Sequence, residues 1–143
     1  MKRYQDHAVL LLRMALAAGF LSAVSSRLGL WGEQSSGWEN FLAYTEKVNS
    51  FAPKNCIPAL AILSTVIESL LALLLLLGYQ TKYAAVAAAI LTLVFALAMT
   101  YSFGIKDPLD YSVFTFSMAA LLLSTMEKYH WSLDQIISKN KTN

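Results

Sequence analysis

Two ionisable side chains stand inside long apolar stretches of the sequence and are the first candidates for chemistry. Arg13 is the only charge in residues 8–26, and Glu68 is the only charge in residues 57–77. An ionisable group within an apolar helix is costly and usually faces a partner in the protein interior. Helical rise places Arg13 roughly 9 Å and Glu68 roughly 13–14 Å from the same membrane face. The pattern predicts an Arg13–Glu68 ion pair, either as a clamp on helix register or as the polar wall of a ligand or proton site.

A second polar cluster lies near the start of the last apolar stretch. Residues 104–111 place Lys106, Asp107, Asp110 and Tyr111 at one helix entry. Negative charge is favoured at a helix N-terminus, so capping alone accounts for the two aspartates. The alternative is that Lys106, Asp110 and Tyr111 shape the mouth of a cavity, at the end opposite to Arg13 and Glu68. Asp110, Ser117 and Ser124 are seven residues apart and are expected to share one helix face.

Other kinds of chemistry find little support in the sequence. His7 and His130 fall outside the apolar stretches, so neither a haem nor another metal site is expected. Cys56 is the only cysteine, which excludes an internal dithiol mechanism. A net charge of +2 without a basic stripe gives no indication of nucleic-acid binding. We therefore expect no covalently bound cofactor.

The elements that position these residues follow from composition. The chain has 143 residues, of which 57% are hydrophobic and 14% charged. Soluble domains average about 45–50% apolar residues with glycine included and about 25% charged residues. Four segments have the length of about 17–25 residues that a membrane helix needs. They are residues 8–26, 57–77, 83–103 and 108–126, and they predict an all-α integral membrane four-helix bundle that forms a single domain over residues 1–143.

The parts between and after these spans also carry helix signals. Ser36 and Glu39 have the spacing of a capping box before an amphipathic pattern, which predicts an extracytoplasmic helix at about residues 37–50. This helix is either an aromatic anchor at the membrane interface or a lid over a ligand cavity. Ser132 and Gln135 form a second capping box in the tail, residues 127–143. Lysines and arginines in the flanks place both termini in the cytoplasm, with the first span kept as an uncleaved helix.

Several of these stretches together resemble the DoxX family of small four-helix bacterial membrane proteins. They are residues 11–16 (LLRMAL), residues 67–68 (IE) with the run to residues 77–82 (LGYQTK), and residues 104–114 (GIKDPLDYSVF). The positions that match the family pattern are Arg13, Glu68, Lys106, Asp110 and Tyr111. The chain departs from it at residues 22–25 (SAVS), where many members have His-Gly, and at residues 69–70 (SL), where many have glycines.

The resemblance implies a redox association, because the family takes its name from a subunit linked to a thiosulfate:quinone oxidoreductase. We therefore expect a redox-associated subunit of the bacterial cytoplasmic (inner) membrane that binds quinone or another hydrophobic ligand between its helices. Besides the lipid bilayer, a redox partner protein and further copies of the chain are candidate partners. The alternatives are a non-catalytic scaffold or assembly partner, and a small transporter. The transporter is disfavoured because the sequence shows neither broken helices nor an inverted repeat.

Overall fold

The computed structural model describes residues 2–140, which fold into helices joined by short loops, without a strand in that range. Two single-turn 3₁₀ segments, Gly32–Gln34 and Lys54–Cys56, flank the second helix. The α-helices are α1 (Lys2–Arg27), α2 (Trp38–Val48), α3 (Ile57–Leu77), α4 (Thr81–Phe103), α5 (Lys106–Asp110), α6 (Val113–Ser124) and α7 (Leu133–Asn140). The predicted all-helical class is confirmed.

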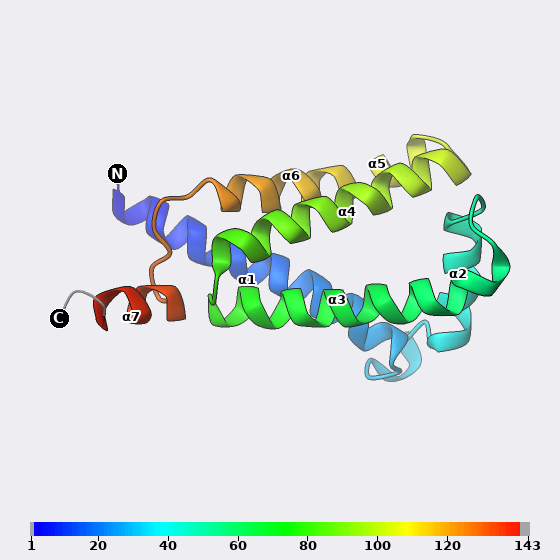
Figure 1. Cartoon of the computed structure of the whole chain (residues 1–143), viewed down its shortest axis with the longest axis horizontal. Coiled ribbons are helices and arrows are strands. Elements are labelled where there is room, and N and C mark those ends of the chain that lie inside the picture. Colours follow the sequence, from blue (N-terminus) through cyan, green and yellow to red (C-terminus); the bar gives the residue numbers. More distant parts are fainter. Residues whose placement is uncertain (1, 141–143) are drawn as a thin grey trace.

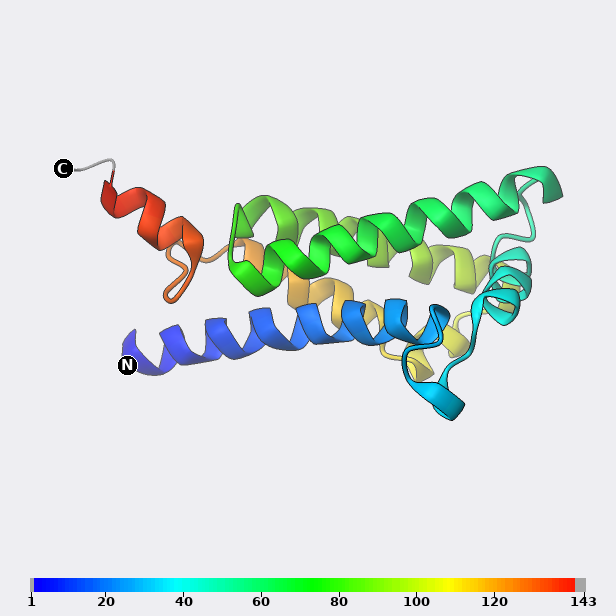
Figure 2. The same ribbon diagram turned by 90° about the horizontal axis from the view of Figure 1, so that it is seen from below.

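Helices α1, α3, α4 and α6 run alternately in opposite directions and form an elongated bundle (Figure 1). Helix α1 packs mainly on α3, and α4 packs mainly on α6, while contacts between α3 and α4 and between α1 and α6 join the two pairs. The start of α1 and the whole of α7 lie at one end of the bundle, and α2 and α5 lie at the other (Figures 1 and 2).

Within residues 2–140, three helices are long and apolar enough to cross a membrane, namely the segments Tyr4–Arg27, Lys54–Leu77 and Thr81–Phe103. Helix α6 is also apolar but has only 12 residues. At 1.5 Å per residue it covers about 18 Å, less than the roughly 30 Å of a hydrocarbon core. The protein is therefore a multi-pass helical membrane protein with three full-length spans and one shorter apolar helix.

The fourth span is broken, although the sequence analysis expected a continuous helix over residues 108–126. Helix α5 ends at Asp110, Ser112 has a left-handed backbone with φ of 56°, and α6 begins at Val113. Aspartate, tyrosine and serine are modest helix formers, so the Asp110–Ser112 stretch gives a helix little support. The expectation that the chain has no broken helix is wrong, and the predicted common face of Asp110, Ser117 and Ser124 is split.

The serines of α6 remain buried where the pattern placed them. Ser117 and Ser124 are 0% and 5% exposed, whereas the Asp110 side chain is 56% exposed. The Ser117 hydroxyl donates a 2.7 Å hydrogen bond to the carbonyl of Ala89 on α4. Hydrogen bonding of this kind satisfies a buried polar group and fixes α6 on α4.

Small residues bring α6 close to its neighbours in the half of the bundle nearer to α7. Four alanines of α4 (Ala84, Ala85, Ala88 and Ala89) are buried in the core that also contains α6 residues. On α1, a Cβ at Gly19 would stand 2.7 Å from the ring of Phe116 on α6, so any larger residue would require this ring to shift. Small residues at helix interfaces allow such close packing in membranes.

The turn between α3 and α4 is capped by α7, which the sequence did not reveal. Gly78 ends α3 in the left-handed conformation. Thr81 does not cap α4. Instead, the Asp134 carboxylate of α7 accepts hydrogen bonds from the backbone N–H of Gln80 (2.7 Å) and of Thr81 (2.8 Å). A carboxylate is a favourable partner for a helix N-terminus, so α7 is fastened to the start of α4.

The two predicted capping boxes have different outcomes. At α7, the Ser132 hydroxyl accepts a 3.2 Å hydrogen bond from the Gln135 N–H, which confirms the serine half of the second box, while the Gln135 side chain accepts from the N–H of Trp131 at 2.9 Å. At α2, the N-cap residue is Gly37 and no side chain caps the helix, so the Ser36–Glu39 box is not formed. The Ser36 backbone N–H donates to the Ser26 hydroxyl, because the loop folds back on the end of α1.

We predict that Gly78→Ala lowers the melting temperature of the purified protein more than Gly29→Ala does. Both glycines have a left-handed φ, which costs an alanine about 1–2 kcal/mol. Only at Gly78 does the new Cβ meet other atoms, 2.5 Å from Ser132 Cβ and 2.6 Å from Arg13 Nη1. Thermal unfolding of both variants in one detergent checks this, and equal losses would contradict the packing of Arg13 and Ser132 on the turn.

Candidate functional site

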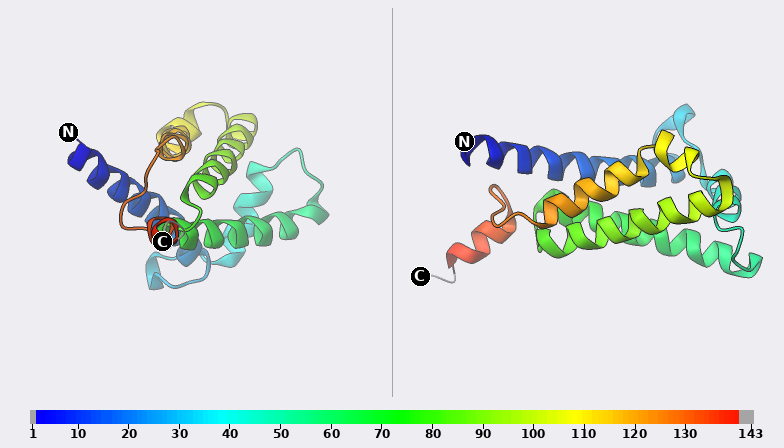
Figure 3. Two further views of the ribbon diagram at one scale, coloured as in Figure 1. Left: turned by 60° about the vertical axis from the view of Figure 1, so that its left-hand side comes forward. Right: turned by 90° about the horizontal axis from the view of Figure 1, so that it is seen from above.

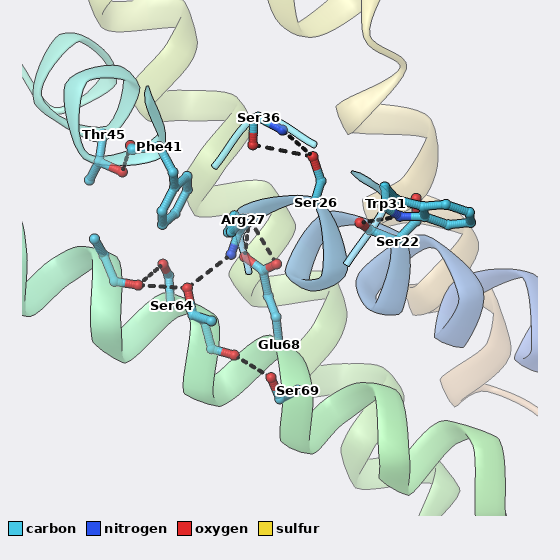
Figure 4. A network of polar contacts seen from close by, with 12 residues as sticks. Ser22, Ser26, Arg27, Trp31, Ser36, Phe41, Thr45, Ser64, Glu68 and Ser69 are labelled. Carbon is cyan, nitrogen blue, oxygen red and sulfur yellow. Dashed lines mark hydrogen bonds and ion pairs between the residues drawn. The ribbon is translucent and has the colours of Figure 1, made fainter. Parts of the chain in front are cut away.

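The ion-pair partner of Glu68 is Arg27, so the predicted Arg13–Glu68 pair is wrong. The Nη2 of Arg27 lies 2.9 Å from Oε2 and 3.1 Å from Oε1 of Glu68 (Figure 4). Both side chains are largely withdrawn from solvent, at 12% and 2% exposure. Arg13 and Arg27 are 14 residues apart on α1, or about 21 Å by helical rise. Glu68 can reach only one of them.

Arg13 lies instead at the end of the bundle where α7 docks. Its side chain is buried, and its Nη2 donates a 2.7 Å hydrogen bond to the carbonyl of Trp131. Its Nη1 would lie only 2.6 Å from a Cβ at Gly78, and the negative charge of Asp134 is close enough to interact with the guanidinium. Within the described residues, Nε and Nη1 have no hydrogen-bond acceptor. Arg13 therefore joins α1 to the α3–α4 turn and to the segment before α7.

Arg27 is held by more than its carboxylate partner. Its Nη1 lies 3.3 Å from the hydroxyl of Thr65, one turn before Glu68 on α3. Its guanidinium carbon lies 3.9 Å from the centroid of the Phe41 ring on α2, a cation–π contact (Figure 4). A guanidinium has more N–H donors than these contacts use. Arg27 thus connects α1, α2 and α3 and keeps donors available for another group.

A cavity of about 630 Å³ lies beside Arg27, between α2, α3 and α4. Among the described residues that line it, Arg27 is the only charged one, and most of the others are apolar. The apolar lining includes Leu60, Leu63 and Ile67 of α3 and Leu91, Val94 and Leu97 of α4. The polar groups of the lining are few and lie toward the α2 end, namely Arg27, Tyr44, Thr45, Asn49, Ser64 and Tyr101.

The cavity forms because α3 and α4 diverge. They are close at the turn of residues 78–80 and separate toward the end that holds α2 (Figures 1 and 3). The first half of α4 presents alanines to its neighbours, while the second half presents larger residues such as Leu91, Phe95 and Met99. Helices approach closely where their residues are small and stand apart where they are large. The residue order along α4 thus shapes a wedge that opens toward α2.

Helix α2 covers the wide end of this wedge. Phe41, Tyr44, Thr45 and Val48 follow helical spacing and all line the cavity. Of the two interpretations of this helix, the contacts favour a lid over an anchor alone. Burial raises the pKa of the Tyr44 phenol, with nearby Tyr111 and Asp107 raising this pKa further. Tyr44 therefore stays protonated at neutral pH and presents a hydrogen-bond donor.

The other three predicted site residues lie at the same end of the bundle as the cavity, but they do not line it. Lys106 pairs with Asp110 one turn later on α5, and both are largely exposed. Tyr111 is 73% exposed and follows directly after α5. They were predicted at the end opposite to both Arg13 and Glu68. They do lie away from Arg13, but at the end of the bundle that also holds Glu68 with its partner Arg27. They form the surface beside α2, so the cavity does not depend on them.

Arg27 is absent from the sequence-predicted site because it lies outside the predicted first span, residues 8–26. Helix α1 continues to Arg27, one residue past the predicted end, so this arginine still belongs to the helix. The sequence does contain an indication of this site, because α2, the helix that follows Arg27, has an aromatic face. Phe41 and Tyr44 of that face turn toward the bundle beside Arg27, and they are absent from the predicted set of site residues.

These features define a multi-pass helical membrane protein with a mostly apolar cavity and a single ion-paired arginine. The chain matches the DoxX family model over residues 8–101, about two thirds of its 143 residues, and it belongs to the DoxX family. The matched region contains Arg13, Arg27 and Glu68 and ends before α5. No curated protein and no solved structure matches the chain.

We predict that a double-mutant cycle couples Glu68 to Arg27 and not to Arg13. Glu68→Gln and Arg27→Gln should each cost about 3–5 kcal/mol of unfolding free energy, because each leaves a buried charge without its partner. The double variant should lose clearly less than the sum. Glu68→Gln with Arg13→Gln should be additive within about 0.5 kcal/mol, since these residues share no contact. Denaturant unfolding in mixed micelles measures all five variants, and coupling of Glu68 to Arg13 would contradict the assignment.

Proposed function

We propose that this protein binds quinone or a similar neutral amphiphile in the cavity between α2, α3 and α4, with the polar headgroup at Arg27. The single observation that carries the proposal is a cavity of about 630 Å³ in which the only charged residue among the described lining is an arginine already paired with Glu68. Sites for small organic ligands span about 300–1,000 Å³ and combine apolar walls with a few placed polar groups.

The charge balance of the site favours a neutral headgroup over an anion. Glu68 compensates the charge of Arg27 at 2.9 Å, so the pair as a whole adds no net charge to the cavity. The guanidinium still offers N–H donors, and the protonated Tyr44 offers an O–H. Carbonyl oxygens accept such hydrogen bonds without bringing charge into an apolar site. A benzoquinone ring has two carbonyls and fits this description.

The membrane location, the orientation of the chain and the redox partner are part of the same proposal. We place the protein in the bacterial inner membrane with both termini in the cytoplasm, on the basis of its lysine and arginine distribution. The redox association, and a partner protein that exchanges electrons with the bound quinone, rest on the family resemblance. A non-catalytic scaffold has no need for a cavity beside a buried ion pair, and the absence of ligand binding would favour that alternative.

We expect purified protein to bind decylubiquinone saturably, as measured by quenching of its tryptophan fluorescence in phosphatidylcholine nanodiscs. The double variant Arg27→Gln/Glu68→Gln removes the charged donor without stranding a carboxylate, and should weaken binding at least tenfold. Two substitutions outside the lining, Lys106→Gln and Tyr111→Phe, should leave affinity within about twofold.

These controls distinguish binding in the cavity from binding at the exposed side chains of Lys106 and Tyr111. Circular dichroism and thermal unfolding of each variant show whether it is folded before binding is compared. No saturable quenching in the wild-type protein would refute the proposed function. Weaker binding in Lys106→Gln and Tyr111→Phe, with unchanged binding in the double variant, would move the site to the α5 surface.

A further inference from the structure

We infer that the ligand reaches this cavity sideways from the hydrocarbon phase of the membrane, through a portal between α3 and α4, and not from water past α2. The inference rests on the proposed function and specifies its ligand class. The cavity takes an amphiphile dissolved in the bilayer, whose apolar part passes between two membrane helices.

The portal is marked by lining residues that are also exposed on the outer surface of the bundle. Leu63 of α3 and Val94 and Leu97 of α4 line the cavity, and each is about 55% exposed. A residue that both lines a cavity and is exposed lies at an opening. Phe51 and Tyr101 also line the cavity and are 60% and 72% exposed, so the opening continues from these three residues toward the ends of the helices. These three side chains are apolar and belong to helices long enough to span a membrane, so they face lipid.

The opening lies below the ends of both helices. Leu63 is six residues from the start of α3, and Leu97 is six residues from the end of α4, or about 9 Å in each case by helical rise. Val94 is three residues deeper. The portal is therefore at the depth of the acyl chains in one leaflet, where a membrane-dissolved ligand has its apolar part.

The route from the aqueous end is obstructed by contacts that hold α2 on the bundle and by the rings of Phe51 and Tyr101, whose centroids are 5.6 Å apart. At its C-terminal end, the Ser102 hydroxyl of α4 donates a 2.6 Å hydrogen bond to the Val48 carbonyl, and the hydroxyls of Ser50 and Ser102 are 2.9 Å apart. Val48 is buried against Ala98 and Met99 of α4. At the other end of α2, Phe41 stacks on Arg27. Entry past α2 would break these contacts, whereas no side-chain hydrogen bond between described residues joins α3 to α4 across the portal.

The test locks the lid and blocks the portal in separate variants. Ser50→Cys/Ser102→Cys, made together with Cys56→Ser, permits a disulfide between α4 and the turn that directly follows α2, because the two hydroxyl oxygens are 2.9 Å apart. Leu63→Cys in the same Cys56→Ser background is labelled with N-cyclohexylmaleimide to fill the portal. Ile62→Cys, labelled identically, is the matched control, since Ile62 is 54% exposed on the same helix and does not line the cavity.

The measurement is the rate at which decylubiquinone, supplied from phosphatidylcholine vesicles, quenches the tryptophan fluorescence of protein in vesicles of the same lipid. We expect the oxidised, locked protein to associate within twofold of the unlocked protein. Labelled Leu63→Cys should associate at least tenfold more slowly than before labelling, while labelled Ile62→Cys changes less than twofold.

A locked lid that slows association tenfold, or a filled portal that leaves the rate unchanged, would overturn the lateral route. Either result would leave the proposed function intact, because the unmodified protein would still bind quinone. The absence of saturable quenching in every variant, locked or unlocked, would overturn the proposed function and the route together. Unlabelled Leu63→Cys that binds like wild type shows that the cysteine itself does not disturb the site.

Discussion

The buried carboxylate of Glu68 is the constraint on which the half of the molecule that contains α2 and the cavity depends. A carboxylate within a membrane helix needs a cation, and here the end of α1 supplies it as Arg27. The pairing holds α1 on α3, and the face of the same guanidinium supports Phe41 of α2. One arginine thereby connects three helices, and its guanidinium is the charged group at the wall of the cavity.

A second arginine has a related role at the other end. Arg13 holds the Trp131 carbonyl and lies against Gly78, so the segment before α7 is fixed on the α3–α4 turn. Asp134 then caps α4 through two backbone N–H groups. Between the two arginines, the packing changes from alanine contacts near Arg13 to larger side chains near Arg27. The bundle is therefore narrow and fastened at one end, and wide with a covered cavity at the other.

Hydrophobic patterns predict much of this fold, because each pattern depends only on residues that are close together in the sequence. Apolar runs identify α1, α3 and α4, and amphipathic spacing identifies α2. The capping pattern at Ser132 was confirmed, whereas the similar pattern at Ser36 was not, because Ser36 is bound to Ser26 of α1. The break after Asp110 was not predicted. The average hydrophobicity of residues 108–126 predicts one helix and carries no information on the left-handed backbone of Ser112.

The sequence by itself determined that this chain is a helical membrane protein of the DoxX family, and that Arg13 and Glu68 would be buried. These properties depend on residue type and on position within one helix. Only the tertiary structure decided which cation meets Glu68, because that depends on how far α1 extends and how it lies along α3. The cavity likewise depends on the divergence of α3 and α4 and on the contacts that hold α2 across it, which join residues far apart in the chain.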